Sequence, residues 1–442
     1  MPAGFLKHPF MSQRAVAACD EDAMVNAMLA FELALAEVQE ASGAVPVGVS
    51  QQMRHQLEIA TFSIADIAEG IASGGNAAIP FVKQGRVLLA DELKRYWHQG
   101  ATSQDVVDSA LMLLLKPRLA ALDELLLRCR SAATALMDAH IDTPMVGRTL
   151  MQQALPITFG VKVAHWAIGL EQSRRRLSHI ELPVQFGGAV GVHSGWDNVG
   201  LEWMDALAER LGLAAPVLPW HTDRYPIHAL GTALDAVAGA AEKVALDVSL
   251  LTQTEVGEVA EPSAPGMGES SSMPHKRNPV RSALIRGAAR QVHGHTSVLI
   301  NAAAQPLERG LGEWHAEWAP LMESVLLVEG ALEQVAVLLE GLEVYPEHMQ
   351  RNLSATGGGI MAEPAARLLA PALGTDRAKA VSAEAAETAR QEARAYADVL
   401  LTHSDVKGII DPESLRKACD PALYLGSSID QVLRTQKWLR IS

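Results

Sequence analysis

The chain has 442 residues, of which 49% are hydrophobic and only 5% aromatic, and its formal net charge is −14 at pH 7. This length is sufficient for two or three domains with a large buried core, and the abundance of Ala and Leu favours helices over sheets. The acidic balance argues against nucleic acid as a partner, because phosphate binding requires a basic surface. The acidic balance does not exclude an anionic small-molecule substrate, since basic side chains can still cluster at one site.

Three cysteines, Cys19, Cys129 and Cys419, lie far apart in the sequence. Their spacing matches neither a disulfide framework nor a zinc motif, so we expect reduced thiols and no metal. The N-terminal segment lacks a continuous apolar stretch, and no apolar run approaches the length of a membrane span. We therefore expect a soluble, cytoplasmic protein with no membrane partner.

The first polar segment to interrupt the helical pattern is residues 97–108, WHQGATSQDVVD. Thr102, Ser103 and Asp105 precede an apolar periodic stretch and are typical of a helix N-terminus, where Ser103 or Asp105 would cap the first turn. His98, Thr102 and Ser103 can also donate hydrogen bonds to a carboxylate at that N-terminus. Taken alone, this segment leaves both interpretations open.

Long stretches in which apolar residues recur every three or four positions predict the main helices. Pro117 in the first of them would kink the helix or mark its true start. The apolar faces are broad, which is typical of helices covered on several sides, in a large bundle or between subunits. The predicted helices span residues 106–139, 156–177, 227–261, 279–304 and 318–342.

The second polar segment, residues 142–160, contains a predicted turn around Thr143 and Gly147, followed by Pro156, which would kink or open the next helix. Arg148 and Gln152 are its chemically capable side chains. An isolated arginine is more often an ion-pairing residue than a ligand contact, so both readings of Arg148 stay open.

The most polar segment is residues 268–280, GESSSMPHKRNPV. Pro274 and Pro279 prevent a helix across it, and Lys276 and Arg277 place two adjacent cations in an acidic chain. Three serines supply hydroxyls and backbone N–H groups beside these cations, which suits a site where negative charge develops on a bound carboxylate. The alternative is an ordinary polar loop, since polar residues are common in loops.

Composition changes near residue 105 and near Pro346 predict three domains. Residues 1–105 would form an N-terminal helical domain, and residues 106–345 a central long-helix domain that carries the serine-rich loop. Residues 346–442, with shorter and alanine-rich helices, would form a C-terminal helical domain.

Three of these segments together resemble the fumarase/aspartase superfamily. That superfamily has a loop of the form Gly-Ser-Ser-x-Met-Pro-x-Lys-x-Asn, matched here by residues 270–278, and a His-x-Gly-x-Thr-Ser-x-Asp segment, matched by residues 98–105. A Gly-Arg-Thr-x-x-Gln segment before a proline is matched by residues 147–156. Three matches in the right order, spread over most of the chain, form a specific signal.

Within that superfamily the chain is most similar to the bacterial cycloisomerases that close an unsaturated tricarboxylate to a lactone in aromatic catabolism. The resemblance implies an all-α, three-domain subunit with a central long-helix bundle, a homotetramer with shared active sites, a small polycarboxylate substrate and no cofactor. The stretches that carry it are GNAAIP (75–80), VQFGGAVG (184–191), PWHTDR (219–224), QTEVGEV (253–259), EPSAPG (261–266), WHAEW (314–318) and DPALYLG (420–426).

The resemblance also assigns roles to individual residues. Ser270 would transfer the substrate proton, and Lys276 would stabilise the negative charge that develops on the substrate, together with Asn278. A larger set of side chains and backbone donors would bind the substrate: His98, Thr102, Ser103, Arg148, Gln152, Ser271, His275 and Asn278.

Two positions depart from the superfamily pattern. Glu269 stands where the serine-rich loop usually has glycine, and Leu150 stands where the elimination enzymes carry histidine. Expelling hydroxide or an amine requires a proton donor, whereas a carboxylate, whose conjugate acid has a pKa of about 4, attacks or leaves without one. Leu150 therefore favours lactone formation over fumarate release.

Two alternatives belong to other classes. One is a lyase that releases fumarate from an adenylosuccinate-like or argininosuccinate-like substrate, and Leu150 argues against it. The other is a non-catalytic structural relative, since the superfamily includes proteins recruited as lens crystallins. Ser270, Lys276 and Asn278 argue against that second alternative.

Overall fold

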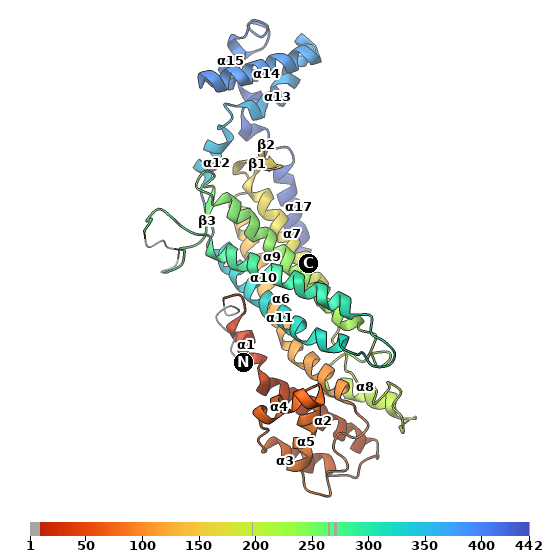
Figure 1. Cartoon of the computed structure of the whole chain (residues 1–442). Helices are drawn as coiled ribbons and strands as arrows, with labels where there is room; N and C mark the ends of the chain where they lie inside the picture. Colours follow the sequence, from red (N-terminus) through yellow and green to blue (C-terminus); the bar gives the residue numbers. More distant parts are fainter. Residues whose placement is uncertain (1–8, 197, 264–265, 269–271, 442) are drawn as a thin grey trace. The chain divides into compact units, whose positions relative to one another are not determined.

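The computed structural model describes residues 9–196, 198–263, 266–268 and 272–441. Within them the chain is mostly helical, with four short strands (Figure 1), so the all-α prediction is confirmed. Two compact units are formed by discontinuous segments: unit 1 by Met1–Leu126, Ser173–Glu242 and Leu284–Glu333, and unit 2 by Leu127–Gln172, Lys243–Ala283 and Gln334–Ser442. The three-domain division stays a prediction.

Unit 1 begins with short helices packed around α2, whose side chains are buried along almost its whole length. Asp20 caps α2 by accepting a hydrogen bond from the backbone N–H of Ala23 at 2.9 Å, which satisfies one of the free donors at a helix start. The helices of this part are α1 (Gln13–Ala18), α2 (Glu21–Ala41), α3 (Val49–Glu58), α4 (Ile64–Gly74), α5 (Ala78–Leu88) and α8 (Gly200–Leu211).

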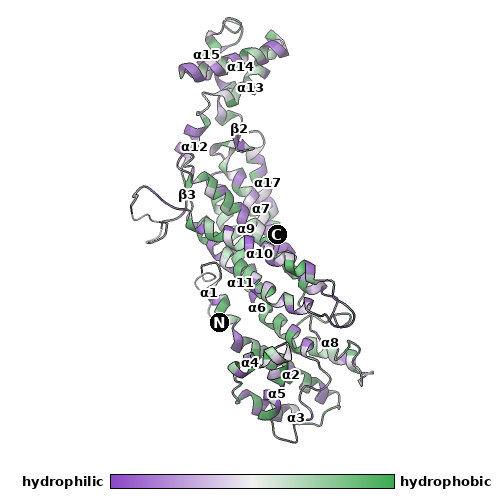
Figure 2. Cartoon of the chain, in the orientation of Figure 1, coloured by the Kyte–Doolittle hydropathy of each residue, from purple (hydrophilic) through white to green (hydrophobic). Residues whose placement is uncertain are grey.

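Five long helices contribute to both units, and hydrophobic and hydrophilic residues alternate along them (Figure 2). The apolar positions of the predicted helix at 227–261 are buried from Leu230 to Leu251, but the helix ends at Leu251, ten residues earlier than predicted. The helix predicted from residue 106 begins at Ser103 and continues through Pro117 without ending. The five are α6 (Ser103–Ala139), α7 (Phe159–Ser178), α9 (Tyr225–Leu251), α10 (Val280–Ala302) and α11 (Glu313–Glu340).

Unit 2 contains an antiparallel hairpin that the helical pattern did not predict, formed by β1 (Pro144–Thr149) and β2 (Gln152–Thr158). Pro156 lies within β2 opposite Val146, so the prediction that it opens a helix is wrong. The turn falls at Leu150 and Met151 rather than at Gly147. Both residues have positive φ, +49° and +66°, as the tight turns of two-residue hairpins require.

The rest of unit 2 joins a second strand pair to a group of shorter helices. Strand β3 (Val259–Ala260) pairs with β4 (Glu343–Val344), and α12 (Pro346–Leu353) follows and packs on β1. Buried residues such as Leu369, Val381 and Leu400 form a core among the next helices. The remaining elements are η1 (Gly359–Met361), α13 (Ala362–Leu373), α14 (Thr375–Glu392), α15 (Tyr396–Thr402), α16 (Pro412–Ala418), η2 (Pro421–Leu423) and α17 (Ser428–Ile441).

None of the described helices combines the length and the hydrophobicity that crossing a membrane requires.

Candidate active site

In unit 1, helix α6 begins among three predicted substrate-binding residues. The carboxylate of Asp105 accepts a hydrogen bond from the backbone N–H of Thr102 at 2.9 Å, and the carbonyl of Thr102 accepts the first helical bond, from Val106. The prediction that Asp105 caps this helix is therefore confirmed. Ser103 is the first helical residue, and the positive end of the helix dipole lies at this point.

Asp105 also connects this helix start to two other segments. Its fully buried carboxylate accepts hydrogen bonds from the backbone N–H groups of Gly187 at 3.1 Å and Gly188 at 2.9 Å, and it contacts Nε2 of His221 at 2.7 Å. Gly188 has a φ of +70°, which an L residue rarely adopts. One carboxylate thus fixes the first turn of α6, the glycine loop and a histidine in one arrangement.

His98 is held by a carboxylate that the sequence did not identify. Its Nδ1 lies 2.5 Å from Oε1 of Glu32, a residue of α2 that is only 2% exposed. Burial acts to lower the pKa of His98, but Glu32, through its charge and its hydrogen bond, and Asp105, through its charge, outweigh it, so the pKa is raised. The cationic form of His98 is therefore favoured.

Arg309 is a further candidate that sequence reasoning missed. It precedes α11, donates a hydrogen bond to Oγ1 of Thr102 at 2.9 Å, and lies 5.9 Å from the ring centroid of Trp314. Burial lowers its pKa despite Asp105 and Asp108, and no carboxylate pairs with it among the described residues. The sequence signal was an arginine just before the WHAEW segment, which by itself is weak.

One helical turn beyond Asp105 lies a buried ionic cluster. Arg224 pairs with Asp108 at 2.7 Å and with Glu317 at 2.7 Å, and all three side chains are almost fully buried. The indole N–H of Trp314 donates to Asp108 at 2.9 Å. These buried contacts hold the first turns of α6 against the neighbouring segments and so stabilise the fold.

In unit 2, the hairpin places Arg148 against a buried carboxylate. Its two terminal nitrogens donate to Glu258 at 2.9 and 2.7 Å, and Asn352 donates to the same carboxylate at 2.8 Å. Glu258 is fully buried, whereas the Arg148 side chain keeps 24% of its exposure. Gln152 is exposed on the same hairpin. Arg148 is thus an ion-pairing residue, and its role as a substrate contact stays a prediction.

Leu150 stands at the tip of this hairpin and is 97% exposed. A large apolar side chain with a positive φ is unusual at so exposed a position. At the position where the superfamily's elimination enzymes carry a histidine, this hairpin therefore has an exposed leucine, which cannot donate a proton.

The serine-rich loop connects β3 to α10 (Figure 1). The backbone N–H and the side-chain amide of Asn278 both donate to the carbonyl of Gly268, at 3.0 and 3.2 Å, which closes the loop. Lys276 and His275 are exposed. Ser270 and Ser271, together with Glu269, lie outside the described residues.

Both ends of this loop are anchored. The carboxylate of Glu261 accepts hydrogen bonds from the backbone N–H groups of Arg281 and Ser282, at 2.9 and 2.8 Å, and so caps α10. The neighbouring cation Arg277 is committed to Glu343 at 2.7 Å and to the carbonyl of Glu261 at 2.8 Å. Of the two adjacent cations Lys276 and Arg277, only Lys276 has a side chain with no hydrogen bond or ion pair within the described part of the chain.

The predicted residues thus form separate groups. Unit 1 brings together His98, Thr102 and Ser103, whereas Arg148 and Gln152 lie on the hairpin of unit 2 and Lys276 with Asn278 on its loop. Within the described ranges there is no group of three or more His, Cys, Asp or Glu residues arranged to hold a metal ion.

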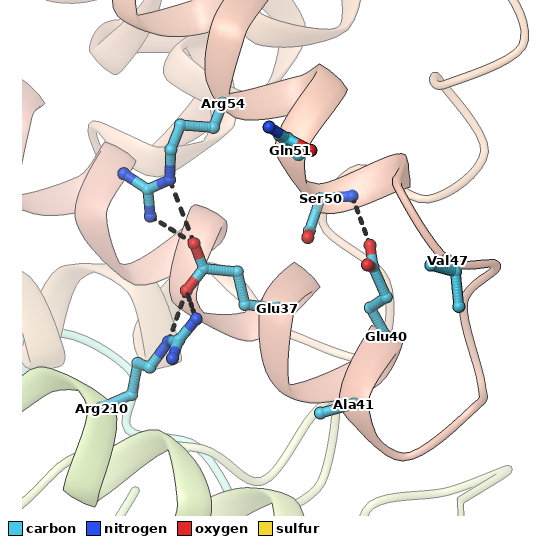
Figure 3. Close-up of a pocket in the computed structure, with 8 residues that line it drawn as sticks. All are labelled: Glu37, Glu40, Ala41, Val47, Ser50, Gln51, Arg54 and Arg210. Atoms are coloured by element: carbon cyan, nitrogen blue, oxygen red, sulfur yellow. Dashed lines mark hydrogen bonds and ion pairs between the residues drawn. The ribbon is translucent and has the colours of Figure 1, made fainter.

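A polar hollow of about 490 Å³ lies between α2, α3 and α8, and none of the predicted site residues lines it (Figure 3). Glu37 accepts hydrogen bonds there from Arg54, at 2.6 Å, and from Arg210. Glu40 accepts hydrogen bonds from the backbone N–H groups of Gly48 and Ser50 at the start of α3. Both carboxylates thus already have partners, Glu37 in ion pairs and Glu40 in backbone hydrogen bonds, which indicates a structural role for this hollow.

Comparisons with known proteins agree along nearly the whole chain. A family profile described as "Lyase" matches residues 10–294. The 3-carboxy-cis,cis-muconate cycloisomerase of Bradyrhizobium diazoefficiens is 41% identical over 96% of both chains, and the nitrosuccinate lyase of Streptomyces davaonensis is 38% identical over 93% of this chain and 90% of its own. The crystal structure of the 3-carboxy-cis,cis-muconate lactonizing enzyme from Pseudomonas putida superposes with a TM-score of 0.94, at 38% identity over 99% of both chains. The chain therefore belongs to the lyase family, within the fumarase/aspartase superfamily that its motifs indicated.

Proposed function

We propose that the protein is a cycloisomerase that converts 3-carboxy-cis,cis-muconate to a carboxymuconolactone. The observation that carries this proposal is the similarity, over nearly the full length of the chain, to enzymes of that name. Leu150 supports the same chemistry, because ring closure by an ionised carboxylate needs no proton donor at the hairpin tip.

In the proposed reaction, an oxygen of one substrate carboxylate attacks a carbon of the conjugated double bond. The electron pair of that bond moves toward a second carboxylate, which becomes an enolate-like dianion, and a proton then adds to the adjacent carbon. Lys276 and Asn278 would stabilise the new charge, and Ser270 would deliver the proton. A preorganised cation has its greatest effect where charge develops during the reaction.

The remaining candidates would bind the substrate carboxylates that do not react. Thr102 and Ser103 at the start of α6, with His98 beside them, offer hydrogen-bond donors and a positive helix end. Arg148 would bind a substrate carboxylate with the part of its guanidinium that stays exposed beside Glu258. Further donors are Gln152, Ser271, His275 and Asn278.

We infer that the enzyme works as a cytoplasmic homotetramer with shared active sites, in the protocatechuate branch of the β-ketoadipate pathway, and without a cofactor. Partly exposed apolar side chains on the long helices, Leu246 on α9 and Val298 and Ile300 on α10, support an assembly through these helices. Such residues commonly become buried when a helix packs between subunits.

The decisive experiment is an absorbance assay with purified protein and 3-carboxy-cis,cis-muconate. We expect the absorbance of the conjugated diene to disappear and the lactone to accumulate. Parallel reactions with nitrosuccinate, adenylosuccinate and argininosuccinate should release no fumarate. An unchanged diene spectrum would reject the proposal, and fumarate release would assign the chain to a lyase activity instead.

A further inference from the structure

We propose that Glu32 is a positioning residue whose buried carboxylate keeps His98 protonated and oriented, so that the second N–H of the imidazolium can bind a substrate carboxylate. This inference rests on the proposed function, because it gives His98 a charged role in the same site. It adds a residue from α2 that none of the sequence motifs contains.

The geometry leaves one ring nitrogen of His98 for a ligand. Nδ1 lies 2.5 Å from Oε1 of Glu32, within hydrogen-bond distance. Nε2 has no hydrogen-bond partner among the described residues, and the side chain is 22% exposed. The neighbouring donors at the start of α6, such as Thr102, belong to the same unit.

The backbone around His98 is held in a defined conformation. Its φ of +59° lies in the left-handed region, which histidine adopts more readily than most L residues. The buried indole of Trp97, which donates to the carbonyl of Val82 at 2.9 Å, fixes the preceding residue. The backbone before His98 and its imidazole ring are thus both held in place, the ring by its contact with Glu32.

The charges around His98 favour its cationic form. Two carboxylates face it, Glu32 from α2 and Asp105 from the first turn of α6, and Glu32 is only 2% exposed. An isolated buried carboxylate is unfavourable, so a cation beside Glu32 stabilises both partners. Two basic side chains contact the same helix start: Arg309 donates to Thr102 and His221 contacts Asp105.

The test compares Glu32→Gln with Glu37→Gln. The glutamine at position 32 can still accept a hydrogen bond from neutral His98, so it removes the charge while the geometry is kept. Glu37 lies on the same helix, and its ion pairs with Arg54 and Arg210 belong to the separate hollow of Figure 3. Glu37→Gln thus controls for the loss of a helix α2 carboxylate.

We expect Glu32→Gln to raise KM for 3-carboxy-cis,cis-muconate about tenfold above neutral pH with little change in kcat, because a charge-assisted hydrogen bond is replaced by a neutral one. The sign follows from the raised pKa of His98: the cation persists above its ordinary value of 6.5 in the parent and is lost as pH rises through the raised value. In Glu32→Gln, the rise in KM should begin at lower pH. Glu32→Asp, which keeps the charge, should retain the parental pH profile, and Glu37→Gln should match the parent.

Histidine NMR of the ligand-free protein provides an independent readout, with the His98 resonance assigned by His98→Gln. Its titration should move to lower pH in Glu32→Gln and stay in place in Glu37→Gln. A KM that rises equally at every pH, or an unshifted His98 titration, would overturn the inference. If the parent fails to consume 3-carboxy-cis,cis-muconate, the proposed function is rejected, while the NMR titration still decides whether Glu32 sets the charge of His98.

Discussion

Arg148 and Glu258, which are 110 positions apart in the sequence, form a two-point ion pair in which the carboxylate is fully buried and the arginine is partly exposed. The same carboxylate accepts a hydrogen bond from Asn352 of α12. This triad connects the β1–β2 hairpin to the strand that leads into the serine-rich loop. Arg148 therefore supports the fold of unit 2 whether or not it also contacts substrate.

Arg148→Met should lower the free energy of unfolding by about 3 kcal/mol, because it leaves Glu258 buried with one neutral donor. Arg148→Lys, which keeps the charge but loses the two-point geometry, should cost about 1 kcal/mol. Urea denaturation followed by circular dichroism measures both changes. A Met variant with parental stability and a higher KM would instead make Arg148 solely a ligand contact.

Lys276→Met should lower kcat by about 10²–10³-fold, because it removes the cation that opposes the charge formed during ring closure. The side chain is exposed, so the thermal midpoint should stay at the parental value. Lys243→Met provides the matched control: Lys243 is an exposed lysine of α9 paired with Asp247, and its loss should leave kcat unchanged. Parental turnover in Lys276→Met would contradict the proposed mechanism.

Leu150→His should change kcat and the thermal midpoint little, by about twofold or less in rate, as expected of an exposed substitution. Histidine tolerates positive φ better than most residues, so the hairpin turn should persist. The pH profile of kcat/KM, measured from pH 6 to pH 9, should match that of the parent. A new ionisation in that profile, or fumarate release from nitrosuccinate, would show that the hairpin tip takes part in proton transfer.

Glu343→Gln should weaken the anchor of the serine-rich loop. Hydrogen bonds from Arg277 and Tyr345 lower the pKa of Glu343 to about 2. A lowered pKa in the folded state contributes stability above the ordinary value of 4.5, and this stability is lost as pH falls toward 2. Because the pair is more than one third exposed, we expect the variant to lose less than about 1 kcal/mol at pH 7.

The difference between Glu343→Gln and the parent should shrink steadily below pH 4.5. Chemical denaturation at several pH values measures it, and proteolysis within residues 261–279 reports on the loop itself. Equal differences at pH 7 and pH 3.5 would show that the anchor does not depend on the charge of Glu343.

The helices could be predicted from the sequence because their signal is local. The buried positions Leu230, Leu234 and Val237 of α9 recur at the spacing that the pattern required. The hairpin was missed because Pro156 was interpreted as a helix start, although a proline is also accepted in a short strand at a sheet edge. The turn was missed because Leu150 and Met151 adopt positive φ without being glycine or asparagine.

The site residues that stand in a short sequence motif could be predicted. The residues that contact them from distant parts of the sequence could not. His98, Thr102 and Lys276 each stand in a short motif. Glu32 lies 66 positions from His98, and Arg309 lies 207 positions from Thr102, and single-sequence periodicity carries no information about contacts at such separations.

Asp105 makes the start of α6 resistant to piecemeal change. Replacing this one carboxylate would remove its hydrogen bonds to the glycine loop, to His221 and to the helix start at the same time, so a single substitution there should loosen all three segments. Substitutions that change ligand preference are therefore expected at side chains whose replacement leaves these hydrogen bonds intact, such as Ser103.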